Sequence, residues 1–186
     1  MASERVFADG VCSELAEWFE IEREVTGVHC SGRRVRVDAI MRPHDLSGWL
    51  DPDPVFAVEF KREAFDTFDT RDFTRWAAQA VSYTHVLWDG LDRAACVFVC
   101  PGVTARLARA CGSKGADLHA RLLWQLGVGE LCYRTDSRSA WRPNGWELIA
   151  AGDHALWTAR RGALSARHWK LRPRVGSGSA QVMALD

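Results

Sequence analysis

The segment Val55–Lys61 constrains the fold of this chain most, because it is typical of a buried β-strand and yet carries two charged side chains. Its sequence, VFAVEFK, consists mainly of β-branched and aromatic residues and follows a proline-rich stretch. Side chains alternate along a strand, so Glu59 and Lys61 point from one face, together with Ala57. A carboxylate and an ammonium group are costly to bury without a partner or a chemical task. We therefore expect a polar site on one face of this strand.

A second strand is expected at Arg34–Met41, whose sequence RVRVDAIM alternates between apolar and polar residues. Asp38 falls on the polar face of this strand. The prolines, glycine and aspartates of residues 42–54 predict a loop, and antiparallel pairing across that loop would bring Asp38 opposite Glu59. The expected apolar face holds Val35, Val37, Ala39 and Met41.

Helices are expected on both sides of these strands. Capping residues predict one helix at Asp9–Glu24, followed by a strand and turn at His29–Arg33, and a second helix from residues 67–72 to about Trp88. Ala94–Cys100 is typical of a buried strand. The resulting order, α-β-β-β-α-β, predicts an α/β fold. Later helices are expected at 104–111 and 116–126, and later strands at 130–135 and 146–150.

The net charge of zero hides an uneven distribution of charge. Residues 1–93 carry 11 basic and 18 acidic side chains, whereas residues 94–186 carry 13 basic and 6 acidic ones. Such an asymmetry indicates contact with a nucleic acid or a membrane. No apolar run reaches the roughly 20 residues that span a bilayer, and the first residues lack a signal-peptide core, so we expect a cytoplasmic protein without a membrane partner.

Basic residues gather between His154 and Arg174, a stretch without any acidic residue. Trp157 and Trp169 lie among them, a pattern suited to phosphate contacts and base stacking, although a solvated arginine-rich C-terminus has the same composition. We therefore divide the chain into one domain at 1–153, with its core at about 9–100, and a basic segment with a flexible tail at 154–186. The candidate phosphate-binding residues are Arg160, Arg161, Arg167, Lys170, Arg172 and Arg174, and, near the Asp38 strand, Arg33, Arg34 and Arg36.

The charged residues of the two strands indicate one class of reaction. Asp38 and Glu59, with the main-chain carbonyl of Phe60, supply hard oxygen ligands for Mg²⁺ and leave positions open for water and a phosphate. Lys61 would orient or deprotonate that water, or neutralise the charge that develops on the phosphate. This is the chemistry of phosphodiester hydrolysis. The alternative is that Glu59 and Lys61 form a cross-strand ion pair at an exposed edge.

These residues resemble the motifs of the PD-(D/E)xK nuclease superfamily. Asp38 is followed across one loop by Glu59-Phe60-Lys61, and the next predicted helix carries Gln79-Ala80-Val81-Ser82-Tyr83, which is similar to the QxxxY motif of the RecB-like and phage-exonuclease-like branch. The resemblance covers residues 9–100 and implies a restriction-endonuclease-like αβββαβ core, a central mixed sheet flanked by helices, with mixed α/β additions after it. It implies a Mg²⁺-dependent DNA nuclease, with Mn²⁺ as a substitute, that belongs to a phage, a mobile element or DNA processing. Both endonuclease activity, with cuts inside the strand, and exonuclease activity, with cuts from its ends, stay as alternatives.

The resemblance also implies roles for residues of the second predicted helix. In that branch the glutamine and the tyrosine face the metal site and help to place the lysine and the DNA backbone. Gln79 and Tyr83 are therefore expected at the site, because residues four apart share one helix face. Arg75, one turn earlier, is expected to contact DNA.

The resemblance leaves two alternatives in the metal site. Family members often add a glutamate from the first helix; Glu14, at the border of the buried helix face, is the expected one, and Glu17 is the second choice. No proline precedes Asp38, where the superfamily name has one, whereas Pro52-Asp53 carries that dipeptide. Asp53 is therefore the alternative to Asp38.

Two other interpretations stay open. The same fold without activity would be a nucleic-acid-binding or protein-interaction module, and the same site acting on RNA would be a ribonuclease. The expected partner is DNA, whether single-stranded, duplex or branched, and a homodimer is an open alternative. The presence of Asp38, Glu59 and Lys61 together favours the enzyme.

Overall fold

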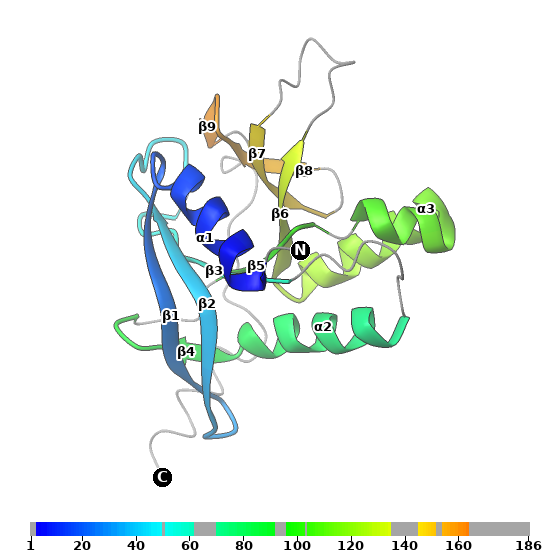
Figure 1. Ribbon diagram of the computed structural model, residues 1–186, viewed down its shortest axis with the longest axis horizontal. Coiled ribbons are helices and arrows are strands. Elements are labelled where there is room, and N and C mark those ends of the chain that lie inside the picture. Colours follow the sequence, from blue (N-terminus) through cyan, green and yellow to red (C-terminus); the bar gives the residue numbers. More distant parts are fainter. Residues whose placement is uncertain are drawn as a thin grey trace.

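A curled, mixed sheet of nine strands organises the part of the chain that the structure describes (Figure 1). This structure is a computed structural model, and it describes residues 3–49, 51–61, 70–91, 96–102, 104–134, 145–151 and 154–163, with the backbone alone at 70–73 and 104–111. The elements are α1 (Glu4–Leu15), β1 (Phe19–His29), β2 (Arg34–Pro43), β3 (Phe56–Phe60), α2 (Thr70–Tyr83), β4 (Val86–Trp88), β5 (Cys96–Cys100), α3 (Thr104–Gln125), β6 (Val128–Arg134), β7 (Gly145–Ala150), β8 (His154–Thr158) and β9 (Gly162–Ala163).

The strands follow the order β4-β1-β2-β3-β5-β6-β7-β8-β9 across the sheet. The central strands β3, β5 and β6 are parallel, whereas the pairs on either side of them are antiparallel. Because parallel strands need crossover connections, β3 leads to β5 through α2 and β5 leads to β6 through α3. The carboxyl ends of the three parallel strands therefore meet at one edge of the sheet.

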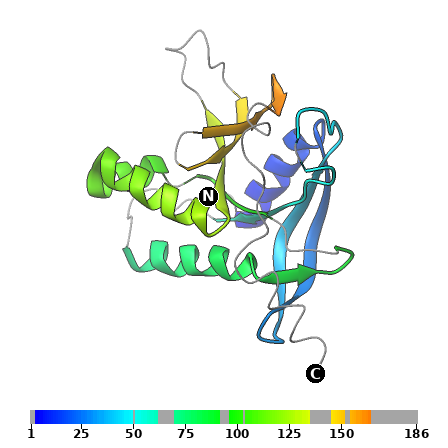
Figure 2. The same cartoon turned by 180° about the vertical axis from the view of Figure 1, so that it is seen from behind.

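The two faces of the sheet carry separate apolar clusters. On one face α1 packs through Val11 and Leu15 against residues of the sheet such as Phe60. On the other face α2 packs through Trp76 and α3 through Ala116. Figure 2 shows these two helices from behind. Burial on both faces explains why β3 and β5 are nearly continuous apolar runs.

The sheet curls until its later strands reach its first ones. Trp157 on β8 lies with its ring centre 4.7 Å from that of Phe19 on β1 and 5.8 Å from that of Trp18. Trp157 is buried, and β8 pairs with β7. Residues 154–163, predicted to begin a separate basic segment, therefore continue the sheet of residues 1–153.

The predicted helix at Asp9–Glu24 is wrong at both ends. The helix begins at Glu4, where the Ser3 side chain accepts a hydrogen bond from the Val6 amide at 3.3 Å, and it ends at Leu15. Residues from Phe19 onward form β1, because they pair with β2 on one side and with β4 on the other. Sheet pairing thus overrides the helical spacing of apolar residues in this segment. His29–Arg33, predicted as a strand and turn, is the tip of the β1–β2 hairpin.

The predicted apolar face of β2 is split at Asp38. Val35 and Val37 belong to the α2 side, whereas Ala39 and Met41 belong to the α1 side. Glu24, across the ladder from Asp38 on β1, has a φ of 57°, in the left-handed region that non-glycine residues rarely occupy. The alternation of side chains changes at this point of the ladder. Strict alternation, assumed from the sequence, could not predict that change.

The helix predicted to reach Trp88 ends at Tyr83, because Val86–Trp88 pairs with β1 as β4. The other predicted elements agree with the structure within a few residues. The helices predicted at 104–111 and 116–126 correspond to the two parts of α3, which a kink at Gly112 separates, with a φ of 76° and a ψ of 161°. Among the described residues, no helix combines the length and the apolar character needed to cross a membrane.

Candidate active site

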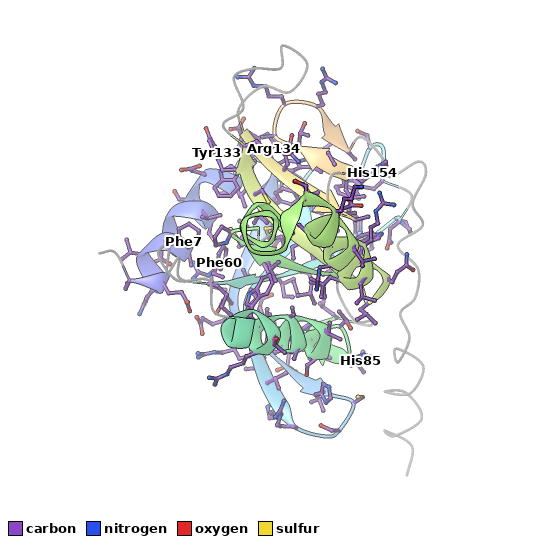
Figure 3. The ribbon with its side chains drawn as sticks, turned by 90° about the vertical axis from the view of Figure 1, so that its right-hand side faces the viewer. Phe7, Phe60, His85, Tyr133, Arg134 and His154 are labelled. Atoms are coloured by element: carbon purple, nitrogen blue, oxygen red, sulfur yellow. The ribbon has the colours of Figure 1, made fainter. Side chains whose placement is uncertain are left out.

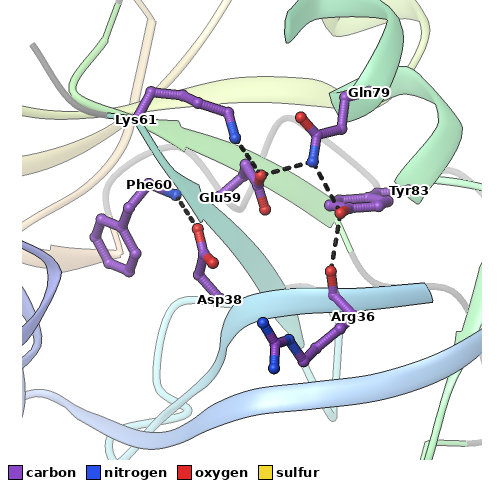
Figure 4. A network of polar contacts seen from close by, with 7 residues as sticks. All are labelled: Arg36, Asp38, Glu59, Phe60, Lys61, Gln79 and Tyr83. Carbon is purple, nitrogen blue, oxygen red and sulfur yellow. Dashed lines mark hydrogen bonds and ion pairs between the residues drawn. The ribbon is translucent and has the colours of Figure 1, made fainter. Parts of the chain in front are cut away.

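Five of the predicted site residues meet at the carboxyl end of β3 (Figure 4). Asp38 comes from β2, Glu59 and Lys61 from the end of β3, and Gln79 and Tyr83 from α2. The antiparallel register of β2 and β3 pairs Ala39 with Val58, and one further step of that register brings Asp38 opposite Glu59. This juxtaposition is the one that the sequence predicts.

Asp38 is fixed by the backbone of β3. Its Oδ2 atom accepts a hydrogen bond of 2.7 Å from the amide of Phe60. Burial raises the pKa of Asp38, although the Phe60 hydrogen bond and the positive charge of Lys61 oppose that shift. The predicted role of the Phe60 carbonyl as a metal ligand stays a prediction.

Glu59 is the buried centre of the network. Glu59 is 4% exposed, and its Oε1 atom accepts hydrogen bonds from Lys61 Nζ at 2.5 Å and from Gln79 Nε2 at 2.7 Å. Burial and the nearby negative charge of Asp38 raise the pKa of Glu59 to about 7, against the opposing effect of Lys61. The proximity of the two carboxyl groups thus adds to burial in disfavouring the state in which both are ionised.

Gln79 and Tyr83 extend the network to the backbone of β2. Gln79 Nε2 also donates to the Tyr83 hydroxyl at 2.9 Å, and that hydroxyl donates to the main-chain carbonyl of Arg36 at 2.8 Å. Both helix residues lie on the same face of α2, one turn apart. Each hydrogen of the Gln79 amide thus has an acceptor, so the side chain holds Glu59 in one orientation.

Arg23 on β1 is a residue of the site that sequence reasoning missed. Its Nε donates to the Asp38 carbonyl at 3.1 Å, its guanidinium donates to Asp9 on α1 at 2.8 Å, and it lies 5.8 Å from the ring centre of Phe60. Arg23 thereby ties α1 and β2 to the end of β3. Arg23 could have been identified only if this segment had been predicted as a strand, because the strand pairs Arg23 with Ala39, next to Asp38.

The carboxylate predicted from the first helix, Glu14, is bonded to a residue outside the network around Glu59. Glu14 accepts a hydrogen bond of 2.6 Å from the Trp146 indole on β7. Glu17, the second choice from sequence, is exposed in the turn after α1. The negative charge of Glu4 acts on both Asp38 and Glu59, raising the pKa of each. Ten residues of helix, about 15 Å, separate Glu4 from Glu14. Glu14 thus has a partner outside the Glu59 network, and its predicted role as a metal ligand stays a prediction. The predicted helix begins at Asp9, after Glu4.

The alternative metal ligand Asp53 lies apart from this network. It is exposed in the loop before β3, and its amide donates to the Asp51 carboxylate at 3.1 Å. Among the residues that the structure describes, no group of three or more His, Cys, Asp or Glu side chains is arranged to hold a metal ion. The candidate site thus rests on the pair Asp38 and Glu59.

The predicted phosphate-binding residues are spread over the molecule. Arg34 and Arg36 pair with Asp89 at 3.0 Å and with Glu24 at 2.7 Å, and Arg33 is exposed at the hairpin tip. Arg75 is exposed on α2, one turn before Gln79. Arg160 and Arg161 are exposed between β8 and β9. The remaining candidates lie outside the described residues: Arg167, Lys170, Arg172 and Arg174.

The base-stacking role expected of Trp157 is wrong. The indole is 4% exposed and packs against Phe19 and Trp18, so neither of its faces is available to a nucleobase. Trp169, the other tryptophan expected to stack on a base, lies outside the described residues.

Comparison of the sequence with protein-family models finds no matching model. Comparisons with curated proteins and with solved structures find no match either. The function must therefore be inferred from the site itself.

Proposed function

We propose that this protein is a Mg²⁺-dependent nuclease that hydrolyses phosphodiester bonds of DNA, built on a restriction-endonuclease-like core. The observation that carries the proposal is the network around Glu59, in which a buried carboxylate faces a second carboxylate and also receives a lysine and a glutamine. An exposed ion pair, the alternative from sequence, does not account for a glutamate that is 4% exposed. Burial of this many polar groups is costly unless they serve a task.

The donor set of the pair fits a divalent cation. Mg²⁺ prefers oxygen ligands, often one or two carboxylates, and keeps several water molecules. Burial and, after it, the negative charge of Asp38 raise the pKa of Glu59 to about 7, and a bound cation would oppose both effects. Mg²⁺ bound there would supply charge neutralisation at the phosphate and a more acidic water.

The protein's own residues would then orient the reaction. Lys61 reaches Glu59 through its Nζ and is about one-third exposed, so it can also reach a phosphate or an attacking water. Gln79 holds the shared Glu59 carboxylate, and Tyr83 anchors Gln79 to β2. Arg23 and the Phe60 amide hold Asp38.

The architecture supports the proposed core. The elements α1, β1, β2, β3, α2 and β5 occur in the order αβββαβ, with the short β4 added at the sheet edge. Asp38 lies on the second strand of this set and Glu59 on the third, as the PD-(D/E)xK resemblance implies. The helix α3 and the strands β6 to β9, which follow β5, would then be mixed α/β additions to the core.

A substrate panel tests the proposal. The wild type and Lys61→Ala are incubated with single-stranded, duplex and branched DNA and with RNA, in Mg²⁺, Mn²⁺ or EDTA. Lys114→Ala is the matched control, because Lys114 is an exposed lysine on α3. We expect metal-dependent cleavage of DNA by the wild type and Lys114→Ala, and a loss of about 10²-fold or more in Lys61→Ala.

Each other result contradicts the proposal. Equal products from the wild type and Lys61→Ala would remove Lys61 from the chemistry. Cleavage confined to RNA would indicate a ribonuclease. Salt-dependent DNA binding without cleavage in any metal would indicate the non-catalytic binding module.

A further inference from the structure

Tyr133 differs from the other exposed apolar residues. Its side chain is 52% exposed, and in the described part of the chain it is the one aromatic residue among the exposed large hydrophobic ones. It lies at the end of β6, next to Arg134. A half-exposed tyrosine at the end of a strand leaves part of its ring free to contact a flat ligand.

The ring of Tyr133 is held in place from one side. Tyr133 pairs across the ladder with Trp146 on β7, and their ring centres are 5.3 Å apart at an interplanar angle of 78°. Trp146 is itself buried, and its indole donates to Glu14 on α1 at 2.6 Å. Tyr133 is therefore a rigid, half-exposed aromatic surface, which loses little conformational entropy on binding a flat ligand.

Tyr133 lies at the same edge of the sheet as the candidate active site. Val99 on β5 pairs with Glu59 on β3 and with Glu130 on β6, so these two glutamates are level in the sheet. Tyr133 follows Glu130 by three positions, and Lys61 follows Glu59 by two. Strands lie about 4.8 Å apart, which puts β6 about 10 Å from β3.

Figure 3 shows Tyr133 and Phe60 toward the side of the molecule where α1 lies. Tyr133 shares the α1 face with Trp146, whereas Glu59 shares the α2 face with Ala57. A ligand that touches both Tyr133 and Glu59 must therefore pass over the carboxyl edge of the sheet. A flexible single strand of nucleic acid can follow such a path more easily than a stiff duplex.

We propose that Tyr133 stacks on a base of single-stranded DNA whose phosphodiester lies at Lys61 and Glu59. This inference rests on the proposed function. The backbones of β3 and β6 are about 10 Å apart, and the opposite faces of the two side chains lengthen the path between them, so the stacked base lies several nucleotides from the phosphodiester at Lys61. Internal bases of a duplex have both faces covered by their neighbours, so the contact selects unpaired DNA.

Binding measured in EDTA tests this inference without any cleavage. Fluorescence anisotropy compares wild type, Tyr133→Phe and Tyr133→Ala on a single-stranded oligonucleotide and on a duplex of the same sequence. Leu118→Ala is the matched control, because Leu118 is an exposed apolar residue on α3, which packs on the α2 side of the sheet. We expect about tenfold weaker binding of the single strand by Tyr133→Ala, with no change for the duplex, Tyr133→Phe or Leu118→Ala.

A second measurement locates the stacked base. A 2-aminopurine is moved along the oligonucleotide, and its fluorescence should fall at one position in the wild type and in Tyr133→Phe but not in Tyr133→Ala. Equal binding by the wild type and Tyr133→Ala, an equal loss on duplex, a loss confined to RNA, or quenching that persists in Tyr133→Ala would overturn the inference. An absence of DNA cleavage in every metal, with this stacking intact, would instead overturn the proposed nuclease alone.

Discussion

Glu59 links the chemistry of the site to the stability of the protein. Its pKa is raised from 4.5 to about 7 in the folded protein, so between these pH values the folded chain holds a proton that the unfolded chain releases. The stabilising contribution of this proton is fully present below pH 4.5 and is lost as the pH rises through about 7. The free energy of unfolding in EDTA should therefore fall by up to about 3 kcal/mol over this range.

Urea denaturation in EDTA, from about pH 4 to pH 8, checks this dependence. Glu59→Gln keeps the shape of the side chain and removes its proton equilibrium, so the decline should largely disappear in this variant. An unchanged pH dependence in Glu59→Gln would assign the effect to other groups.

The backbone of Glu24 offers a test of strain beside Asp38. Its φ of 57° costs a non-glycine residue about 1 kcal/mol, while its exposed ion pair with Arg36 contributes little. Glu24→Gly should leave the free energy of unfolding unchanged or raise it by up to about 1 kcal/mol. Glu22→Gly, at an exposed position of the same strand, should lower it by about 0.5–1 kcal/mol. Thermal or urea unfolding compares the two; a larger loss in Glu24→Gly would contradict this account.

Among the elements, the junction of β1 and β4 depends on the absence of a side chain at Gly27. A Cβ there would lie 2.6 Å from the Leu87 carbonyl oxygen and 2.8 Å from the Trp88 ring. Gly27→Ala should therefore destabilise the protein by about 1–3 kcal/mol. Gly10→Ala, in α1 with nothing within 4 Å of the new Cβ, should stabilise it by about 0.5–1 kcal/mol. Equal stabilities of the two variants would show that β4 does not pack as described.

The strands near the site could be predicted from sequence, whereas the first helix could not. RVRVDAIM and VFAVEFK have strong β-patterns with a single loop at residues 42–54 between them, so the pairing of Asp38 with the end of β3 follows from local chemistry. Residues 19–24 also fit a helical period, and only their pairing with β2 decides for a strand. The same pairing places Arg23 beside Asp38, a neighbour that the sequence did not indicate.

For the whole molecule, closure of the curled sheet depends on Trp157. This buried indole joins β8 to Phe19 and Trp18 at the other end of the sheet. Trp157→Ala should lower the free energy of unfolding by about 3–5 kcal/mol. Leu118→Ala, at a position 67% exposed, should change it by less than about 0.5 kcal/mol. A small effect of Trp157→Ala on urea unfolding would mean that residues 154–163 are an independent segment after all.

The arrangement of charge over the whole molecule could be inferred only in part from sequence. The two carboxylates of the candidate site, Asp38 and Glu59, both lie in the acidic first half. The basic second half does not form a separate arm within its described part, since β8 completes the sheet and buries its tryptophan. The sequence shows where charged residues lie along the chain, but it does not show which tryptophan side chains are buried. Their burial depends on how the nine-stranded sheet curls.

The most direct test of the central claim, that Asp38 and Glu59 form a catalytic metal site, is the rate of DNA cleavage as a function of Mg²⁺ concentration. The wild type is compared with Asp38→Asn, which keeps the size of the side chain and its acceptor for the Phe60 amide. Wild-type cleavage should rise with Mg²⁺ and saturate, and Asp38→Asn should lose at least about 10²-fold at every concentration. Equal cleavage by both proteins, or none by the wild type at any Mg²⁺ concentration, would contradict the claim.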